Sequence, residues 1–458
     1  MNLFSEEDNE KKTKNPQEQT HELLPIKNKK IELQQIAEQT SSDGGLLLLK
    51  EIEEQIKLIE DLTNCIKDKR NQRYIQHDLC SLLTQRIFQI AAGYEDANDC
   101  DSLNTDAIFK MCAHKFPSDS SLSSQPTMSR FENSVTNSDL YRIAECFARK
   151  FIESYVNEPP VIILDCDDTN NNAYGGQQLA LFNNYYKESC FMPLHIYEGL
   201  SGKLISTILK PGRRSKSVNV FSILKRVVYF IRKYWKNTLI ILRGDSHFCS
   251  PDFMNWKEKQ NNIGFITGLS GNTVLNKLAE TTIKSAQNKY KREQIPVKMY
   301  HTFEYKANTW EEEQRVIVKV EVNKRGTNIR YIVTDQRKYR TKNLYELGYC
   351  KRGEMELFIK EHKTYLKSDR TSCNSFKANQ FRLFLHSASY VLIHSLQKNI
   401  FYGTKLFNAT KRTIQLKIIK IAAHVKELKT KIKVEFPHTN PQKGLLAKSF
   451  NIFEVLRN

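Results

Sequence analysis

Acidic residues follow two apolar stretches of the chain, at the point where each stretch ends. Asp165, Asp167 and Asp168 close the segment VIILDCDD, and Asp245 closes TLIILRGD. Strand alternation places Asp165 and Asp167 on one face and Asp168 on the other. A single aspartate in such a position more often caps a loop. Two such strand ends side by side would instead gather the oxygen ligands that divalent cations prefer.

A third candidate region extends from Tyr349 to Lys363 and has a helical pattern. At about 100° per residue, a helix brings four of its polar side chains within about 60° of one another, while Glu354 and Glu361 point away. The four are Tyr349, Arg352, Glu356 and Lys363. This face would combine one carboxylate with two cations. The alternative interpretation is a solvated charged face, which many helices carry.

The charge of the chain indicates which class of molecule it binds. Its 458 residues include 70 Lys and Arg against 51 Asp and Glu, a formal net charge of +19. Nucleic acid is the first candidate partner, although a basic surface can also serve solubility alone. The ten cysteines form no CxxC pair and no zinc-finger spacing, so we expect free thiols. Without an apolar leader or an 18-residue apolar run, the sequence predicts a soluble cytoplasmic protein that contacts no membrane.

The N-terminal third predicts a tail followed by helices. Residues 1–42 are polar and charge-rich, and we expect them to be disordered or loosely helical. Apolar residues recur at helical spacing over 43–155, which predicts an all-helical N-terminal domain that binds DNA. Within it, a turn would lead into a helix with Ser124 as N-cap and Pro126 in the first turn. This helix, which carries Arg130, would enter a DNA groove or form an ordinary packing corner.

Strand patterns begin after Pro159-Pro160 and indicate an α/β region over 156–274. The sequence predicts strands at 161–168, 190–197, 203–209, 238–245 and 263–269, with helices at 218–235 and 251–260. The order β-β-β-α-β-α-β is that of a ribonuclease-H-like core, in which the first and fourth strands are neighbours. In that arrangement the acidic ends of the two strands meet.

The remaining chain falls into three parts. Residues 275–344 contain the alternating segments RVIVKVEV and IRYIVTD around a turn, which predicts a hairpin within a β-rich insertion. Residues 345–400 return to a helical pattern and would complete the core as its second part. Residues 401–458 carry 12 Lys or Arg against three acids and include the alternating IKVEF. We expect a strand there and a basic surface that faces DNA.

The spacing Y-x2-R-x3-E-x6-K of the third region resembles the signature of DDE insertion-sequence transposases. More closely, the chain resembles the group called IS-thirteen-eighty, from about residue 43 to the C-terminus. The segments that carry this resemblance are GGLLLLKEIEEQI, SQPTMSRFEN, LDCDDTNNNAYGGQQ, FNNYYKESCFMPL, ILRGDSHF, YCKRGEMELFIKEHK and SDRTSCNSFKANQFRLFLHSASYVL. Relatives often have His-Gly before the Gln of the first motif, where this chain has Gly175-Gly176-Gln177, so no histidine role is expected there.

The resemblance implies a ribonuclease-H-like catalytic core, interrupted by a β-rich insertion before the glutamate. It implies a DNA transposase that cleaves at insertion-sequence ends and transfers the 3′-hydroxyl strand into target DNA. Carried over by motif, the catalytic and metal-binding residues are Asp167, Asp245 and Glu356. Asp165 competes with Asp167 for the first position, because the two share a strand face.

The same resemblance implies the cofactor and the partners. Two Mg²⁺ ions, replaceable by Mn²⁺, would bind the three acids, and Tyr349, Arg352, Lys363 and Arg130 would bind DNA. The partner would be double-stranded DNA, as terminal inverted repeats and as target, bound by a homodimer assembled on DNA near the bacterial nucleoid. Two other functions are compatible with these residues: an inactive protein that recognises terminal repeats, and a nuclease that hydrolyses DNA without joining it.

Overall fold

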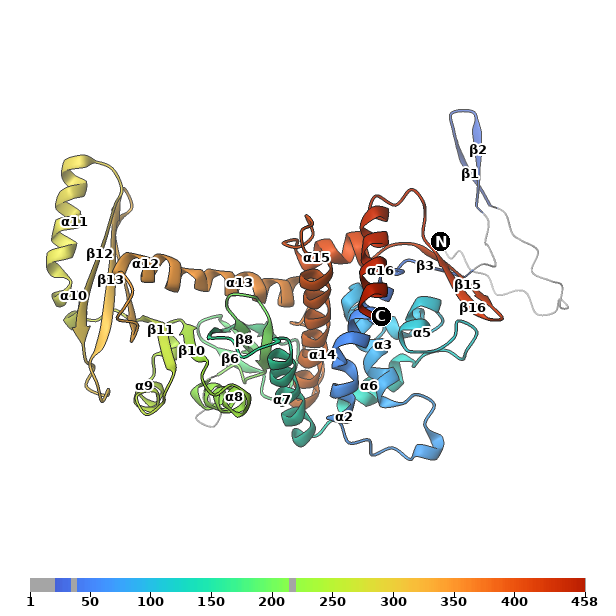
Figure 1. Cartoon of the computed structure of the whole chain (residues 1–458), viewed down its shortest axis with the longest axis horizontal. Helices are drawn as coiled ribbons and strands as arrows, with labels where there is room; N and C mark the ends of the chain where they lie inside the picture. The colour runs from blue at the N-terminus through green and yellow to red at the C-terminus, as the bar shows by residue number, and fades with distance from the viewer. Residues whose placement is uncertain (1–20, 34–38, 214–219, 458) are drawn as a thin grey trace, which may run out of the picture.

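The computed structural model describes residues 21–33, 39–213 and 220–457. Figure 1 shows an elongated molecule, with N-terminal helices, a central sheet and a β-rich extension arranged along its long axis. Helices from the C-terminal part of the chain lie among those of the N-terminal part. In the described ranges, no helix is both long and apolar enough to cross a membrane.

One mixed sheet of eight strands forms the centre of the molecule, in the order β12-β13-β14-β11-β10-β4-β8-β9. Five of its strands come from the predicted α/β region: β4 (Val161–Asp168), β8 (Leu194–Glu198), β9 (Leu204–Ile208), β10 (Leu239–Gly244) and β11 (Ile263–Leu269). Strand β4 pairs in parallel with β10, and β10 with β11, while β8 is antiparallel to β4. The first strand of this region therefore lies beside the fourth, as its element order predicts.

The parallel pairing of β4 with β10 decides where the acidic residues meet. The register runs from Val161 opposite Leu239 to Asp165 opposite Arg243, so both strands end at the same edge of the sheet. Asp167 and Asp245 each follow at that edge. This is the edge at which α/β sheets usually place their sites.

Alternation along β4 divides the sheet into two faces. Ile162, Leu164 and Cys166 belong to an apolar core with three helices, α7 (Asn137–Glu153), α8 (Val220–Tyr234) and α9 (Pro251–Lys257). Asp165 and Asp167 point to the opposite face. There the neighbouring strand β8 contributes Tyr197, whose ring contacts aromatic side chains of the helical segments beyond residue 350.

The β-rich stretch extends the central sheet and does not form a sheet of its own. Its strands are β12 (Val297–Tyr305), β13 (Gln314–Asn323) and β14 (Gly326–Thr334), and β14 pairs antiparallel with β11. The predicted hairpin is confirmed as β13–β14, whose turn ends at Gly326 with a positive φ of 111°. Two helices that the pattern did not predict, α10 (Thr273–Leu278) and α11 (Glu280–Glu293), precede these strands. Figure 1 shows this extension at the left end of the molecule.

The helices at 46–153 share one core with helices from the end of the chain. The N-terminal set comprises α1 (Leu46–Ile56), α2 (Leu58–Asn64), α3 (Leu79–Ala92), α4 (Asp99–Leu103), α5 (Ala107–Cys112), α6 (Gln125–Asn133) and α7. The C-terminal set comprises α14 (Phe376–Ser395), α15 (Lys411–Ile414) and α16 (Lys443–Arg457). Phe381 and Phe384 of α14 contact Phe131 and Phe147, with ring centroids 5.3 and 5.6 Å apart. The N-terminal helices therefore do not have a core of their own.

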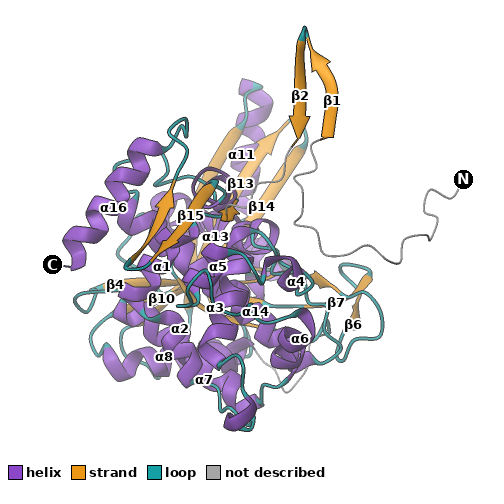
Figure 2. Ribbon diagram, turned by 90° about the vertical axis from the view of Figure 1, so that its right-hand side faces the viewer, coloured by secondary structure: helices purple, strands orange, loops and turns teal. Residues whose placement is uncertain are grey.

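Strands occur where the tail was expected to be disordered or loosely helical. Strands β1 (His21–Ile26) and β2 (Lys29–Leu33) pair as a hairpin, which projects from the body in Figure 2. Strand β3 (Gln39–Ser41) pairs with β15 (Ala423–Leu428), which pairs in turn with β16 (Lys431–Glu435). The expectation for the tail is thus wrong at 21–33, where β1 and β2 pair with each other, and at 39–41, where β3 pairs with β15. Its parts at 1–20 and 34–38 lie outside the described residues.

Candidate active site

Asp165 is fully buried and paired with Arg243, its direct neighbour in the β4–β10 ladder. Arg243 donates from Nε and Nη2 to the two carboxylate oxygens, at 2.5 and 2.6 Å, and from Nη1 to the carbonyl of Gly348 at 2.7 Å. Burial raises the pKa of Asp165 to about 6 and Arg243 opposes this effect. A side chain at Gly199 would collide with the pair. The charge of Asp165 is therefore compensated by a buried partner, which favours the more exposed Asp167 as the acid of this face that a ligand can reach.

Asp167 lies two residues further, at the carboxyl end of β4, and is partly exposed. Its Oδ2 accepts a hydrogen bond from Arg352 Nη1 at 3.0 Å, and its Oδ1 accepts from the amide of Asp168 at 3.0 Å. Burial raises the pKa of Asp167 to about 6, Arg352 lowers it, and the negative charge of Asp245 raises it further. Asp167 and Asp245 thus interact electrostatically, as neighbouring strand ends predict.

Asp245 follows β10 and caps the short 3₁₀ helix Ser246–Phe248. Its Oδ1 accepts from the backbone amide of His247 at 2.8 Å, and its Oδ2 contacts Nδ1 of the same residue at 2.7 Å. The loop-capping interpretation of this aspartate is therefore correct for its local contacts. Its charge nevertheless acts on both strand-end acids of β4, because it opposes ionisation of Asp167 and Asp168.

Asp168 and Lys210 form a contact that sequence reasoning missed. Lys210, just beyond β9, donates to Asp168 Oδ2 at 2.6 Å. Among the described residues, Asp168 Oδ1 has no hydrogen-bond partner, although it is buried. Burial raises the pKa of Asp168, Lys210 opposes this, and Asp245 adds to it. The pairing could be found only from the strand order, because Lys210 lies 42 residues away in the chain.

The segment predicted as one helix over Tyr349–Lys363 is helical but irregular. The helical stretch that contains it begins earlier, with α12 (Thr341–Asn343) and a π-helical turn at Leu344–Tyr349. A 3₁₀ turn at Cys350–Arg352 leads into α13 (Gly353–Lys360), and a second π-helical turn follows at Glu361–Tyr365. A constant 100° per residue does not describe it. The four side chains of the predicted face still converge on the strand ends, as their contacts below show.

Arg352 lies among the three acids proposed as ligands. Its Nη1 donates to Asp167, and its Nη2 is 3.5 Å from Glu356 Oε1. Burial would lower the pKa of Arg352, but Asp167, Asp245 and Glu356 are among the groups that together raise it. The guanidinium is therefore the shared counter-charge of the carboxylates from all three regions.

Tyr349 and Lys363 contact the same edge of the sheet. Burial raises the pKa of Tyr349, with Arg352 and Asp245 as its charged neighbours. A side chain at Gly268 would come within 2.9 Å of the Tyr349 hydroxyl, so this ring crosses closely over β11. Lys363 Nζ donates to the carbonyl and to Oδ1 of Asn170, the latter at 3.1 Å. Lys363 thereby joins the irregular helix to the loop after β4.

The three glutamates of this helix have different surroundings. Glu356 is 65% exposed and faces Arg352. Glu354 forms an exposed ion pair with Lys351 at 2.7 Å, and Glu361 contacts the buried Lys411 at 2.7 Å. Only Glu356 of the three contacts a residue of the acidic edge in these pairs. This agrees with the face predicted for it.

The donor chemistry of this edge fits a hard divalent cation, although the ligands are not preassembled. Within the described residues, no group of three or more His, Cys, Asp or Glu is close enough to hold a metal ion. Arg352 takes the place of a cation between Asp167 and Glu356. Asp168 Oδ1 has no partner, and the pKa of Asp167 is raised mainly by burial and further by the negative charges of Asp245 and Asp168. A cation would relieve this repulsion. Asp167, Asp245 and Glu356 are the residues that would bind it.

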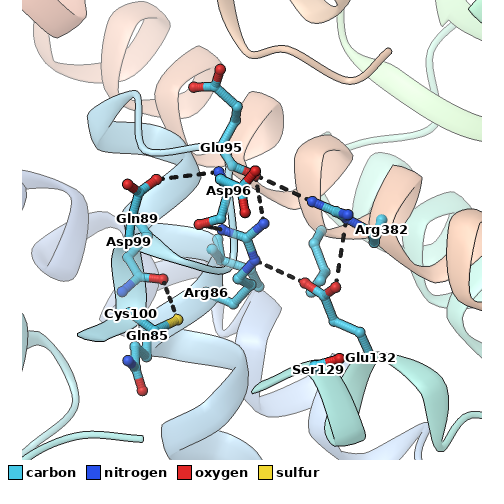
Figure 3. Close-up of polar contacts among 12 residues, drawn as sticks. Gln85, Arg86, Gln89, Glu95, Asp96, Asp99, Cys100, Ser129, Glu132 and Arg382 are labelled. Atoms are coloured by element: carbon cyan, nitrogen blue, oxygen red, sulfur yellow. Dashed lines mark hydrogen bonds and ion pairs between the residues drawn. The ribbon is translucent and has the colours of Figure 1, made fainter. Parts of the chain in front are cut away.

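Helix α6, the proposed groove-binding helix, begins after Ser124 and has Pro126 in its first turn, as predicted. Figure 3 shows how the helix is held. Glu132 of α6 accepts from Arg86 Nε of α3 at 2.9 Å and lies 3.5 Å from Arg382 Nε of α14. This buried pair of arginines around one glutamate fixes the orientation of α6 relative to the shared core.

Arg130, predicted to bind DNA, lies on the exposed part of the same helix. Its Nη2 donates to Thr127 Oγ1 at 3.2 Å, a contact within one turn of α6. Since Arg130 forms no contact with the acidic edge among its hydrogen bonds, its proposed role is separate from that of Arg352. It is available to a ligand that approaches the N-terminal helices.

In this protein, acidic residues lie at the ends of two parallel strands of a mixed α/β sheet, close to Arg352 and Lys363. The carboxylates of such a site can bind cations, and its cationic side chains can bind phosphate groups. The chain matches the family described as transposase DDE domain group 1 over residues 23–458, and it belongs to this family. It is thus a transposase of the DDE type. No curated protein matches the sequence. Among solved structures, it is similar to piggyBac transposase in a cryo-EM synaptic complex with hairpin DNA, at 10% identity and a TM-score of 0.43, with 82% of this chain and 79% of that chain covered.

Proposed function

We propose that this transposase cuts DNA at the ends of an insertion sequence and joins the freed 3′-hydroxyl to target DNA, with two metal ions held by Asp167, Asp245 and Glu356. The observation that supports this proposal is the position of Arg352 among all three acids, which come from three separate parts of the chain. The strand order of β4, β8, β9, β10 and β11 supports a ribonuclease-H-like core that carries them.

The three carboxylates would hold two Mg²⁺ ions, which activate the attacking oxygen and stabilise the leaving oxygen of a phosphodiester; Mn²⁺ would substitute. Asp167, at the end of β4, would be the ligand contributed by the first acidic segment. Asp245, which follows β10, and Glu356 of α13 would be the ligands from the second and third segments. Asp165 keeps Arg243 neutralised and holds β4 and β10 in register, so it supports the site without binding the metal.

The cationic side chains would bind the DNA backbone. Arg352, which neutralises the acids in the protein alone, has the planar donor geometry to pair with a phosphate once its carboxylates are otherwise compensated. Lys363 would bind a phosphate as a point charge, and Tyr349 would donate a hydrogen bond. Arg130 and the basic segment 401–458 would contact DNA further from the cut. We also propose that two copies act together on DNA, because an element has two ends and each chain contributes one set of acids.

One assay separates this function from its alternatives. The full chain is incubated with labelled element ends, a target plasmid and Mg²⁺. Strand-transfer products support the transposase, nicks without joining indicate a nuclease, and retardation without cutting indicates a binding protein. The full chain is needed because the helices at 46–153 share their core with α14 to α16, so a fragment of residues 43–152 would lack the core residues that those helices contribute. Loss of cutting in Asp167→Asn, Asp245→Asn and Glu356→Gln, with binding retained, is expected.

A further inference from the structure

An open cleft of about 600 Å³ lies beside the acidic edge, on the far side of Lys363. Three cations line it, Lys363, Lys367 and Arg370, together with Asn170, Asn172 and Tyr174. Asp369 is the one acid among the residues that form its described wall. The excess of positive charge and the neutral amides suit an anionic ligand with polar edges.

The walls of the cleft are held by defined contacts. Asn170 and Asn172 each donate to Glu188, at 2.7 and 2.8 Å, which orders the loop after β4. On the other wall, Asn171 Nδ2 donates to the carbonyl of Ser368 at 3.1 Å. Because Lys363 also donates to Asn170, the cleft is connected directly to the loop that follows Asp167 and Asp168 of β4. A ligand in the cleft would therefore lie next to the acidic edge.

The two outer cations remain available to a ligand. Lys367 is exposed and has a left-handed backbone with φ of 58°, at the end of the irregular helix. Arg370 is 57% exposed and its Nη2 lies 3.6 Å from Glu95 Oε1, a long contact that solvent screens. Glu95 lies in the loop between α3 and α4, where its carbonyl accepts from Arg86 at 2.6 Å (Figure 3). Arg370 thus connects the wall of the cleft to the loop between α3 and α4.

Tyr174 supplies an aromatic surface at the mouth of the cleft. Tyr174 is 84% exposed, so its ring is accessible to a ligand. Gly175 and Gly176 follow, and a side chain at either position would meet nothing within 4 Å, so a ligand can approach the backbone closely. Bases inside a duplex have both faces covered by their neighbours, so away from the duplex ends an exposed ring can stack only on an unpaired base.

We propose that this cleft binds an unpaired strand of DNA adjacent to the scissile phosphodiester, with Lys367 and Arg370 on its phosphates and Tyr174 stacked on a base. The inference rests on the proposed function, because that function places a phosphodiester at Asp167. A single strand fits the chemistry of the cleft better than a duplex, whose bases offer no free face to Tyr174. The site would therefore prefer ends whose strands have separated near the cut.

The test compares two DNA probes with the full chain, in the absence of divalent metal. One probe is a fully paired element end, and the other is the same end with one strand left unpaired beyond the cut. Fluorescence anisotropy should show tighter binding of the second probe. Stacking is worth about 1–3 kcal/mol per base, so Tyr174→Ala should reduce that preference by roughly 5- to 160-fold. Tyr174→Phe should retain it, because the ring remains.

Matched controls isolate the cleft. Tyr74 is 83% exposed and lies far along the chain on another element, so Tyr74→Ala should leave the preference unchanged. A plot of log affinity against log salt concentration should become less steep by about 0.7 in Arg370→Gln, and only for the probe with the unpaired strand. If Tyr174→Ala weakens the binding of both probes equally, or of neither, the proposal is overturned.

Cleavage is measured in parallel, so that the two proposals fail separately. If the wild-type chain cuts ends with Mg²⁺ while Tyr174→Ala keeps the wild-type preference, the cleft proposal is wrong and the function is supported. If the wild-type chain cuts no DNA but Tyr174→Ala loses the preference, the cleft binds DNA and the proposed function is wrong.

Discussion

Replacement of Asp165 by Asn tests the division of roles between the two acids of β4. Arg243 is 2% exposed and Asp165 is completely buried, so the variant leaves a buried guanidinium without its charged partner. Breaking one side of such a pair costs about 3–5 kcal/mol. Arg243 keeps its bond to the carbonyl of Gly348, and the Asn oxygen still accepts one bond. We therefore expect Asp165→Asn to lower the free energy of unfolding by about 3 kcal/mol.

The matched variant is Asp167→Asn, on the same strand face two residues away. It removes a carboxylate that burial and Asp245 already disfavour, so its stability should equal or exceed that of the wild type. Differential scanning fluorimetry without metal measures both variants. A loss of about 3 kcal/mol corresponds to a fall of roughly 6–12 °C in Tm for a domain of about 150–250 residues. Cutting should disappear in Asp167→Asn and persist, at a temperature where the protein is folded, in Asp165→Asn.

The opposite pattern would refute the reasoning. If Asp165→Asn is as stable as the wild type and does not cut DNA, while Asp167→Asn cuts normally, then Asp165 is the ligand and its pairing with Arg243 is not structural. A stable Asp165→Asn variant that cuts DNA would refute only the energetic part, namely that the buried pair contributes several kcal/mol.

Three further predictions follow from the same contacts. Because the pKa of Asp167 is raised to about 6, its ionised form destabilises the folded state at neutral pH. Asp167→Asn should therefore have a higher Tm than the wild type above pH 6, by a free energy of about 1–3 kcal/mol, and the difference should vanish below about pH 4. A difference that does not change with pH would contradict this. Glu132→Gln should destabilise the protein by about 3 kcal/mol, because it leaves Arg86 and Arg382 buried without a counter-charge. The control Glu354→Gln, at an exposed position, should change Tm little. Equal effects of the two variants would show that the contacts of Glu132 with the two arginines do not stabilise the fold. Gel assays of end cleavage should show loss of cutting in Glu356→Gln and near-normal cutting in Glu354→Gln, and normal cutting by Glu356→Gln would remove this residue from the ligand set.

Strands bounded by turns and ending in acids were the most predictable part of the molecule. Strand β11 spans the predicted residues 263–269, and β4 and β10 match their predicted segments to within a residue at each end. Their apolar runs are long enough to be buried and too short for helices. The adjacency of β4 and β10 followed from the element order, which brought Asp167 near Asp245 in the prediction as in the structure.

Features that depend on distant contacts were not predictable. The role of Asp165 required the register that places Arg243 opposite it, and no spacing in the sequence reveals a register between strands over 70 residues apart. The π-helical turns around Tyr349 and Lys363 change the helical phase without changing the residue types. Helix α14 is buried on most of its surface, so its sequence has no clear polar face to show which helices it packs against.

The most direct test of the central claim replaces a proposed oxygen ligand by sulfur. In Asp167→Cys, a thiolate would face the metal position, and it binds Mg²⁺ poorly but accepts Mn²⁺. We predict that this variant cuts labelled element ends in Mn²⁺ and not in Mg²⁺, whereas the wild type cuts in both. If Asp167→Cys cuts equally in the two ions, or if Asp165→Cys shows the Mn²⁺ rescue in its place, Asp167 is not the metal ligand of this transposase.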